Sequence, residues 1–383
     1  MIDKSEASHI QKVYAGRVLL FIGALTMGGA ERQFIVLAKE LKKRGVDVEI
    51  MLNYSGGHFL PELEREDIRY TIIRLGSVWT IPLYLIRAIS AIQRIRPDVI
   101  YGFMGAGVKS TIFNFFLPRF KTIWGVRSSN IEAMQLGISL KIATRLDCIL
   151  SRYADAIIYN SHAGMQDRAA LGWKNDNIHV VPNGIDYNRF KPSDLLRDEM
   201  RQLWGLSPKH VVLGMLARQD PMKDHSNLLS AFALIADEQL RLVLTCEEHD
   251  PLTDFLLAQA TGLGILDKII WAGNKVRPEQ FLNALDIYVQ SSAYGEGFPN
   301  AIGEAMSIGL PVVATDVGDC RRIVADYGWI APAGDASALA EQMHRALKVL
   351  PAWRCDLPRQ HIIDNYSVDR MVYATLQVMT GLQ

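Results

Sequence analysis

Short apolar runs alternate with amphipathic stretches along the whole chain. A short apolar run bounded by turn residues is typical of a strand buried on both faces, and a helical pattern between such runs is typical of helices that cover a sheet. The runs predict strands at residues 17–23, 46–52, 99–102, 122–126, 156–159, 211–216, 242–245, 269–271, 287–290 and 311–314. This alternation predicts an α/β fold built from parallel sheets.

The amphipathic stretches predict helices, among them residues 30–43, 223–236, 278–284 and 300–309. The alternation is interrupted at Val181-Pro182-Asn183-Gly184, where Pro and Asn-Gly mark a turn. We place a domain boundary here, so that residues 1–185 and 186–366 are predicted to form two Rossmann-like, doubly wound domains. In such domains ligands bind beyond the carboxyl ends of the strands, and a cleft is expected between the two.

Composition narrows the function classes. The 383 residues, 49% of them hydrophobic, suffice for two domains with separate cores. The equal numbers of Lys+Arg and Asp+Glu, 41 each, argue against a strongly basic nucleic-acid-binding protein, so no nucleic acid partner is expected. Residues 1–185 nevertheless hold 23 basic against 16 acidic residues. An anionic partner of the first half would explain this excess, and ordinary solvated surface charge would explain it equally well.

The cysteines and the hydropathy of the chain indicate the cellular compartment in which the protein is expected. The four cysteines are scattered without a Cys-x-x-Cys pair, which excludes a disulfide scaffold and a cysteine zinc site. The polar residues 1–11 do not resemble a signal peptide, and the longest apolar stretches are too short to cross a bilayer. We expect a cytoplasmic protein that is either soluble or peripheral on the inner face of the cell membrane.

Gly28 and Gly29 follow the first predicted strand and open the first predicted helix. Adjacent glycines let the backbone approach a ligand closely, and a helix start offers N–H groups to an anion. Neither the dinucleotide fingerprint Gly-x-Gly-x-x-Gly nor a Walker lysine is present. The glycines therefore predict either an anion-binding loop or a plain strand-to-helix turn.

Arg218 and Lys223 flank a short loop between a predicted strand and a predicted helix. Two cations close to a helix start suit a diphosphate, because positive charge and N–H donors then act on the same oxygens. A solvated loop is the alternative interpretation.

Glu296 lies in the loop Gly295-Glu296-Gly297-Phe298-Pro299-Asn300, which leads into a predicted helix. Pro299 is predicted at the first helical position, where its missing N–H costs nothing. Glu304 then lies one turn after Asn300 on the same helix face. Carboxylates accept hydrogen bonds from hydroxyl groups, so the arrangement favours a polyol that also carries phosphate. The plainer alternative is one loop glutamate and one surface glutamate.

The segment Glu296–Thr315, with its Glu-x7-Glu spacing, resembles the signature of the retaining GT-B glycosyltransferases of family 4. The Gly-Gly-Ala-Glu-Arg loop, Asn160-Ser161, the Val-Pro-Asn-Gly-Ile-Asp linker and the pair Arg218 and Lys223 match that family in the same order. The resemblance extends from about Arg17 to the C-terminus. It implies a GT-B fold, two Rossmann-like domains facing a central cleft, in which the last helix, about residues 367–383, packs on the first domain.

The resemblance also implies an activity: retaining transfer of a hexose or N-acetylhexosamine from a nucleotide-diphosphate sugar, most often a UDP-sugar in this family, to a glycan or a polyprenyl-diphosphate-linked saccharide. The second domain would bind the donor and the first the acceptor. Glu304 would hold the ribose, and the turn ending at Val276 would contact the base. Glu296 would hold the donor sugar together with the backbone of Gly297, Phe298, Pro299 and Asn300. Arg218 and Lys223 would bind the diphosphate together with Gly28 and Gly29. No Asp-x-Asp triplet occurs, so neither a metal ion nor another cofactor is expected.

Residues 124–130 depart from the family pattern, in which many relatives carry a histidine near the donor sugar. The sequence Arg127-Ser128-Ser129-Asn130 resembles the branch that acts on lipid-linked or polysaccharide acceptors. Arg127 is expected to contact the donor phosphates or an acceptor diphosphate, with Asn130 on the acceptor side. An ion pair with a carboxylate is the alternative for Arg127.

Residues 79–96 and 111–124 mix aromatic, aliphatic and basic side chains. A basic amphipathic surface could lie on an anionic membrane, which is a further candidate partner, whereas core packing would explain the same residues.

Other function classes also share the architecture, namely a GT-B sugar-nucleotide 2-epimerase or phosphorylase and a non-catalytic nucleotide-sugar-binding protein. Neither the epimerase nor the phosphorylase is expected to combine the Glu-x7-Glu segment with the Gly-Gly-Ala-Glu-Arg loop.

Overall fold

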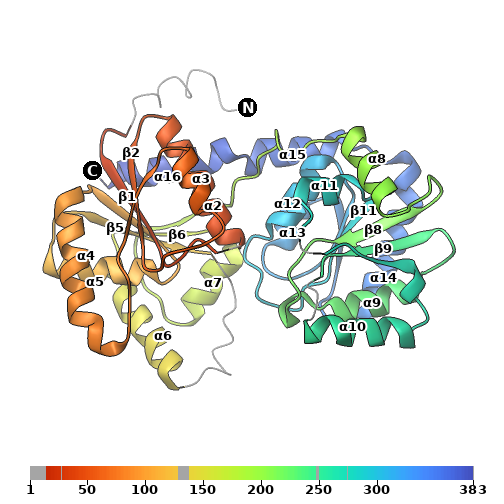
Figure 1. Cartoon of the computed structure of the whole chain (residues 1–383), viewed down its shortest axis with the longest axis horizontal. Coiled ribbons are helices and arrows are strands. Elements are labelled where there is room, and N and C mark those ends of the chain that lie inside the picture. Colours follow the sequence, from red (N-terminus) through yellow and green to blue (C-terminus); the bar gives the residue numbers. More distant parts are fainter. Residues whose placement is uncertain (1–13, 27, 128–137, 247–249, 274, 383) are drawn as a thin grey trace. The chain divides into compact units, whose positions relative to one another are not determined.

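The computed structural model describes residues 14–26, 28–127, 138–246, 250–273 and 275–382. The chain divides into two compact units, the N-terminal unit (residues 1–184 and 368–383) and the C-terminal unit (residues 185–367). The division after Gly184 lies one residue before the boundary placed from the sequence. Each unit is a parallel sheet with helices packed against it (Figure 1).

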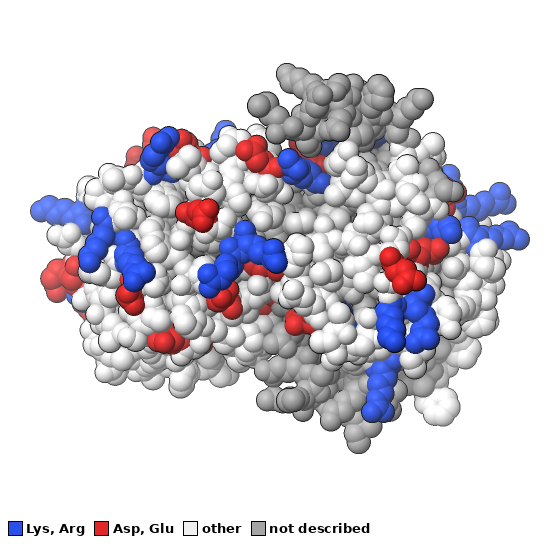
Figure 2. Space-filling model, turned by 180° about the vertical axis from the view of Figure 1, so that it is seen from behind, with Lys and Arg blue, Asp and Glu red and all other residues white. Residues whose placement is uncertain are grey.

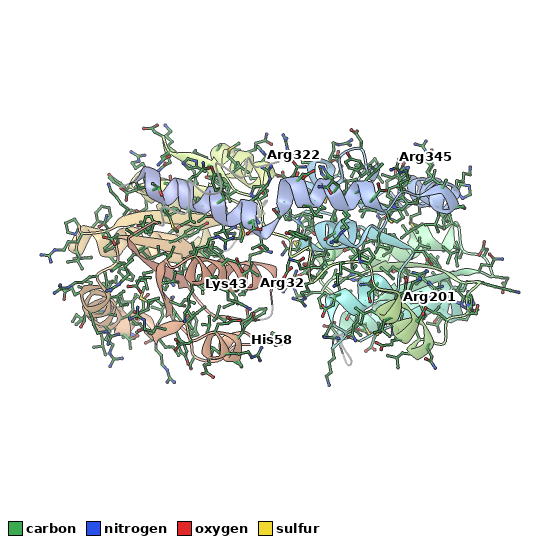
Figure 3. All side chains as sticks on the ribbon, turned by 90° about the horizontal axis from the view of Figure 1, so that it is seen from above. Arg32, Lys43, His58, Arg201, Arg322 and Arg345 are labelled. Atoms are coloured by element: carbon green, nitrogen blue, oxygen red, sulfur yellow. The ribbon has the colours of Figure 1, made fainter. Side chains whose placement is uncertain are left out.

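The N-terminal unit contains a seven-stranded sheet in the order β3-β2-β1-β4-β5-β6-β7, with every neighbouring pair parallel. Its strands are β1 (Arg17–Ile22), β2 (Asp47–Leu52), β3 (Arg69–Ile72), β4 (Val99–Phe103), β5 (Lys121–Val126), β6 (Ala156–Tyr159) and β7 (Ile178–Val180). Its described helices are α2 (Gly29–Lys43), α3 (Leu60–Arg65), α4 (Ile81–Ile95), α5 (Ala106–Phe116), α6 (Ile138–Ser151), α7 (His162–Ala170) and α16 (Val368–Gly381), with a 3₁₀ turn, η1 (Val78–Thr80). The final helix α16 packs against α2, on which Figure 3 labels Arg32 and Lys43.

The C-terminal unit contains a six-stranded parallel sheet in the order β10-β9-β8-β11-β12-β13. Its strands are β8 (Val211–Met215), β9 (Leu240–Leu244), β10 (Ile269–Trp271), β11 (Ile287–Gln290), β12 (Val312–Thr315) and β13 (Gly328–Ala331). Its described helices are α8 (Asp194–Leu203), α9 (His225–Ala233), α10 (Pro251–Gly262), α11 (Pro278–Asn283), α12 (Asn300–Ile308), α13 (Cys320–Val324), α14 (Ala336–Val349) and α15 (Asp356–Tyr366), with 3₁₀ turns η2 (Pro221–Lys223), η3 (Leu266–Lys268) and η4 (Leu350–Ala352).

Both sheets reverse their strand order beside the first strand. Strand β1 lies between β2 and β4, and β8 lies between β9 and β11. In open parallel sheets, ligands bind outside the carboxyl ends of the strands at such a reversal. The loops that follow β8 and β11 carry Lys223 and Glu296, and the loop that follows β1 carries Gly28. The topology therefore places these residues where each unit by itself would bind a ligand.

Every predicted strand is present, with its ends shifted by no more than two residues. The strands that the hydrophobic pattern missed are β3, β7 and β13, and each lies at an edge of its sheet. Edge strands are covered less completely, and most residues of these three are partly exposed. The sequences of β3 and β7 include polar residues and so lack the continuous apolar run that central strands need, whereas β13 is a run of only four apolar residues.

The helices predicted from residues 278 and 300 begin there, and the helix predicted from residue 30 begins at Gly29. The start predicted at residue 223 and the helical position predicted for Pro299 are wrong. The helix predicted from residue 223 begins at His225, because Asp224 adopts a left-handed conformation (φ 48°) that separates η2 from α9. Pro299 is the residue before the first turn of α12 and not its first helical residue. Its extended ψ of 102° keeps it outside the helix, although its carbonyl accepts a hydrogen bond from the Ile302 amide at 3.2 Å.

Candidate functional site

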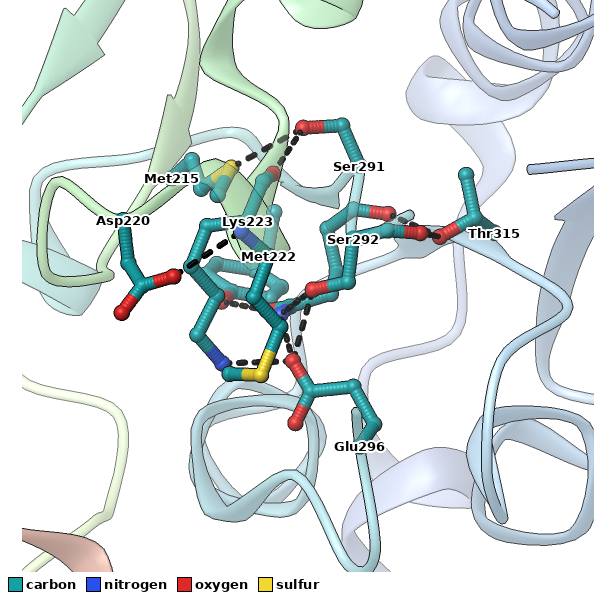
Figure 4. Close-up of polar contacts among 10 residues, drawn as sticks. Met215, Asp220, Met222, Lys223, Ser291, Ser292, Glu296 and Thr315 are labelled. Carbon is teal, nitrogen blue, oxygen red and sulfur yellow. Dashed lines mark hydrogen bonds and ion pairs between the residues drawn. The ribbon is translucent and has the colours of Figure 1, made fainter. Parts of the chain in front are cut away.

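Lys223 and Glu296 form a buried ion pair in the C-terminal unit (Figure 4). The Lys223 Nζ atom lies 2.5 Å from Glu296 Oε1, and the two side chains are only 15% and 6% exposed. Lys223 ends the turn after β8, and Glu296 lies in the loop after β11, the strand beside β8. The structure thus joins directly two residues that the sequence assigned to the diphosphate and to the donor sugar.

The Glu296 loop is fixed by close backbone packing at Gly318. Gly318 has a left-handed φ of 61°, and a Cβ atom there would lie 2.1 Å from the Glu296 carbonyl oxygen. The amide of the next residue, Asp319, donates to the Gly297 carbonyl at 3.0 Å. Only glycine fits this position, and the loop that carries Glu296 is therefore held against the segment after β12.

Glu304 is 2% exposed and lies on α12, one turn after Asn300, as predicted from the spacing. Burial raises the pKa of the nearby Tyr288 hydroxyl well above its usual value, and the carboxylates of Glu296 and Glu304 add to this increase. Both glutamates therefore lie close enough to Tyr288 to act on it electrostatically. The region after β11 concentrates negative charge and hydrogen-bond acceptors, as recognition of hydroxyl groups requires.

The remaining predicted donor-site residues are packed to different degrees. The Phe298 ring packs edge-on against Tyr366 at 5.4 Å between centroids and belongs to the apolar core, so only its backbone can face a ligand. Pro299 is buried, Asn300 is half-buried, and Val276 packs against the same core. Arg218 is exposed and makes no ion pair within the described part of the chain.

His225 is a residue of this site that the sequence analysis did not single out. It is 2% exposed at the first position of α9, and its two ring nitrogens have no hydrogen-bond partner among the described residues. Burial lowers its pKa to about 4, and the neighbouring Lys223 lowers it further whereas Asp220 opposes the change. The imidazole is therefore neutral at pH 7. Its place directly after Lys223-Asp224 was the signal available in the sequence.

In the N-terminal unit, Gly28 precedes the first turn of α2, and Gly29 is its first residue. The Glu31 carboxylate folds back over this start, because a Cβ atom on Gly28 would lie 2.3 Å from Glu31 Oε2. Glu31 Oε1 accepts a hydrogen bond from the Thr26 hydroxyl at 2.8 Å. The glycine pair thus forms a tight strand-to-helix turn, which is one of the two structures expected from the sequence.

Arg127 directly follows β5 and packs its guanidinium group 4.0 Å from the centre of the Phe103 ring. It donates to the Tyr101 hydroxyl at 2.6 Å and to Asn183 Oδ1 at 3.3 Å. Among the described residues no carboxylate pairs with it, and Nε has no partner. The alternative of an ion pair is therefore not seen there, and this partly buried cation lacks a counter-charge within the described residues. The other predicted acceptor residue, Asn130, lies outside the described residues.

Both mixed aromatic and basic stretches carry exposed apolar side chains. In residues 111–124, Phe113, Phe120 and Trp124 are buried in the core, whereas Phe115 is 57% exposed and Phe116 63% exposed. In residues 79–96, Trp79 is 92% exposed and Ile86 65% exposed. On the face shown in Figure 2, basic and acidic side chains are interspersed among uncharged residues. None of the helices in the described residues is both long and apolar enough to span a membrane.

Comparison with known proteins defines the class. Residues 27–189 match the family model described as Glycosyltransferase Family 4, and residues 197–351 match the model described as Glycosyl transferases group 1. The fold is similar to that of Anabaena HepE, solved in complex with UDP, with a TM-score of 0.84 over 95% of this chain and 100% of that chain at 22% identity. Both units thus match glycosyltransferase family models, and the fold is that of GT-B glycosyltransferases, so the predicted fold class is confirmed.

Two curated relatives show how far the likeness extends. The lipopolysaccharide core biosynthesis glycosyltransferase LpsE of Rhizobium meliloti is 26% identical over 92% of this chain and 96% of that protein. The putative glycosyltransferase EpsF of Bacillus subtilis is 28% identical, but the match spans only 37% of this chain and 36% of that protein. Both relatives agree with glycosyl transfer as the activity of this chain.

Proposed function

We propose that the protein is a retaining glycosyltransferase that moves a hexose or N-acetylhexosamine from a UDP-sugar to a glycan or a polyprenyl-diphosphate-linked saccharide in the synthesis of a cell-surface glycoconjugate. The buried pair of Lys223 and Glu296, at the strand reversal of the C-terminal unit, carries this proposal. Support comes from HepE, which binds UDP, and from LpsE, which acts in lipopolysaccharide core biosynthesis.

The C-terminal unit is proposed to bind the donor. As the bond between sugar and phosphate breaks, negative charge grows on the leaving diphosphate, and groups placed in advance around that charge lower the barrier. Arg218, Lys223 and the N–H groups at the start of α12 would stabilise it, and these groups make a bridging metal ion unnecessary. Glu296 would hold the donor sugar and Glu304 the ribose hydroxyls.

The N-terminal unit is proposed to bind the acceptor, with Arg127 as the contact for an acceptor or donor phosphate. Retention would follow from attack on the face that the diphosphate leaves, with a donor phosphate oxygen accepting the proton of the acceptor hydroxyl. Glu296 would not act as a nucleophile. Retaining glycosidases that form a covalent glycosyl-enzyme intermediate place two carboxyl groups about 5–5.5 Å apart across one bond, whereas Glu296 and Glu304 would serve the sugar and the ribose respectively.

Donor binding provides the first test. UDP-sugars should raise the melting temperature of the protein, and EDTA should change neither this shift nor turnover. Glu304→Gln should weaken UDP binding about tenfold, because a charge-assisted hydrogen bond becomes a neutral one. Glu341→Gln, an exposed position on α14, is the control and should bind as the wild type does. Binding of UDP by Glu304→Gln at wild-type affinity would contradict the ribose assignment.

Incubation with a UDP-sugar alone separates the rival function classes. A transferase should release UDP slowly at most without an acceptor, whereas a 2-epimerase would convert the donor sugar. Donor binding with no transfer to any supplied saccharide would favour the non-catalytic binding protein.

Membrane association is a separate proposal that rests on η1 and α4. Trp79 and Ile86 are exposed there, and Arg74, Arg87 and Arg94 line a groove of about 590 Å³ that also includes Ile86. The protein should float with vesicles that contain phosphatidylglycerol at low salt and not with phosphatidylcholine vesicles. Each of Arg87→Glu and Arg94→Glu should weaken binding about fivefold or more, at about 1 kcal/mol per charge. Arg345→Glu on α14 is the control, and absence of flotation would end the proposal.

A further inference from the structure

Three hydrogen-bond donors converge on one oxygen of Glu296 (Figure 4). Oε1 accepts from Lys223 Nζ at 2.5 Å, from Gln290 Nε2 at 2.8 Å and from the Ser292 hydroxyl at 2.6 Å. Gln290 and Ser292 are 1% and 0% exposed. Water therefore competes little for these bonds, and all three donors act on the same carboxylate oxygen.

The direction of these hydrogen bonds is fixed by the Glu296 carboxylate, which pairs with Lys223 and only accepts hydrogen bonds. Gln290 therefore presents its NH₂ group to Glu296 and its carbonyl oxygen to Tyr288. The Tyr288 hydroxyl, whose pKa is raised well above the usual value, donates to this carbonyl oxygen at 2.5 Å. The same NH₂ group donates to the Ser292 hydroxyl at 2.8 Å, which leaves the Ser292 proton for Glu296.

The backbone around Ser292 is also anchored. The Thr315 hydroxyl, at the end of β12, donates to the Ser292 carbonyl at 2.6 Å. The neighbouring Ser291 hydroxyl donates to the carbonyl oxygens of Lys223 and Asp224, at 2.9 and 3.0 Å. Three adjacent segments, after β8, β11 and β12, are thereby tied together around the carboxylate.

We propose that Gln290 and Ser292 are positioning residues that set the orientation of the Glu296 carboxylate toward the donor sugar, an inference that rests on the proposed function of Glu296. Neutralising the buried charge requires only Lys223. Two further neutral donors on the same oxygen add direction, because a carboxylate held by three donors, Lys223 from the segment after β8 and Gln290 and Ser292 from its own β11 segment, cannot rotate freely about its terminal bond. A displaced catalytic contact can cost about 100-fold in rate even when the fold is intact.

Steady-state kinetics with a UDP-sugar and an accepted saccharide test the proposal. Gln290→Leu and Ser292→Ala should each lower kcat about 10- to 100-fold and change the donor KM by no more than about threefold. Ser292→Thr keeps the hydroxyl and should retain most of the activity. Ser307→Ala, on α12, is the matched control. It removes a buried hydrogen bond from the Ser307 hydroxyl to the Phe190 carbonyl and leaves the hydrogen bonds to Glu296 intact. It should lower stability and leave kcat unchanged.

A pH profile of Gln290→Glu separates orientation from packing. The introduced carboxyl has the same shape as the amide but would face Glu296, Lys223 and Tyr288, with Glu304 and Cys320 close by. One of two adjacent carboxyls has a raised pKa, and only its protonated form donates a hydrogen bond. Activity relative to the wild type should therefore rise as pH falls from 8 to 6. A pH-independent ratio would contradict the proposal.

The outcomes distinguish two failures. If Gln290→Leu and Ser292→Ala lower kcat no more than Ser307→Ala does, the positioning role is overturned while the proposed function stands. If Glu296→Gln itself leaves kcat unchanged, the assignment of Glu296 to the donor fails, and the positioning role fails with it.

Discussion

Replacing Lys223 with methionine should lower kcat/KM at least 100-fold and also destabilise the C-terminal unit. The activity falls because a cation next to the leaving diphosphate is lost, and one preorganised charge-stabilising group is worth roughly 100- to 1,000-fold. The stability falls by about 3 kcal/mol because Glu296, 5% exposed, would be left buried without its ion-pair partner. Both quantities are measurable on one preparation, by transfer kinetics and thermal unfolding.

The double variant Lys223→Met/Glu296→Gln separates the two effects. With both charges removed, most of the lost stability should return, because no uncompensated charge remains buried. Activity should not return, since neither the cation nor the carboxylate is available to the donor. Lys209→Met, at an exposed position, is the control for loss of a lysine charge. Recovery of activity in the double variant would mean that the pair serves only the structure.

Gly318→Ala should be the most damaging glycine substitution near the site. The added methyl group would overlap the Glu296 carbonyl oxygen at 2.1 Å, and a non-glycine residue at φ 61° is strained as well. We expect a loss of about 3 kcal/mol, from about 1 kcal/mol of backbone strain and the remainder from overpacking. Because the overlap is with the backbone of Glu296, kcat should fall together with stability.

Gly334→Ala is the matched control for this prediction. Gly334 has a similar φ of 71°, but a Cβ atom there would meet nothing within 4 Å. The melting temperature of the Gly334→Ala variant should fall by only a few degrees, as expected for a loss of about 1 kcal/mol of stability in a unit of this size. The kcat of this variant should equal that of the wild type. Equal losses in the two variants would show that the contact with Glu296 has no influence on the site.

The sequence pattern predicted the central strands because they are covered on both faces and must be continuously apolar, as Val18–Ile22 is. It missed the edge strands β3, β7 and β13, because one side of each carries no neighbouring strand, and the partly polar sequences of β3 and β7 suffice there. Local hydrophobicity reports burial and not strand pairing. The start of α9 was misplaced for another reason, since the left-handed Asp224 has no distinctive sequence signal.

For the candidate site, too, some features could be predicted from the sequence and others required the tertiary structure. The sequence by itself determined which residue types lie after which strand: two cations after β8, two glutamates around the start of α12, and Arg127 after β5. Only the tertiary structure decided that Lys223 bonds to Glu296, that Gln290 and Ser292 share the same oxygen, and that Arg127 lies on Phe103 without a paired carboxylate among the described residues. The order of residues follows from local chain properties, whereas Lys223 and Glu296, 73 residues apart, meet because β8 and β11 are neighbours in the sheet. Gln290 and Ser292 are close to Glu296 in the chain, but the sequence does not show that their side chains turn toward its carboxylate.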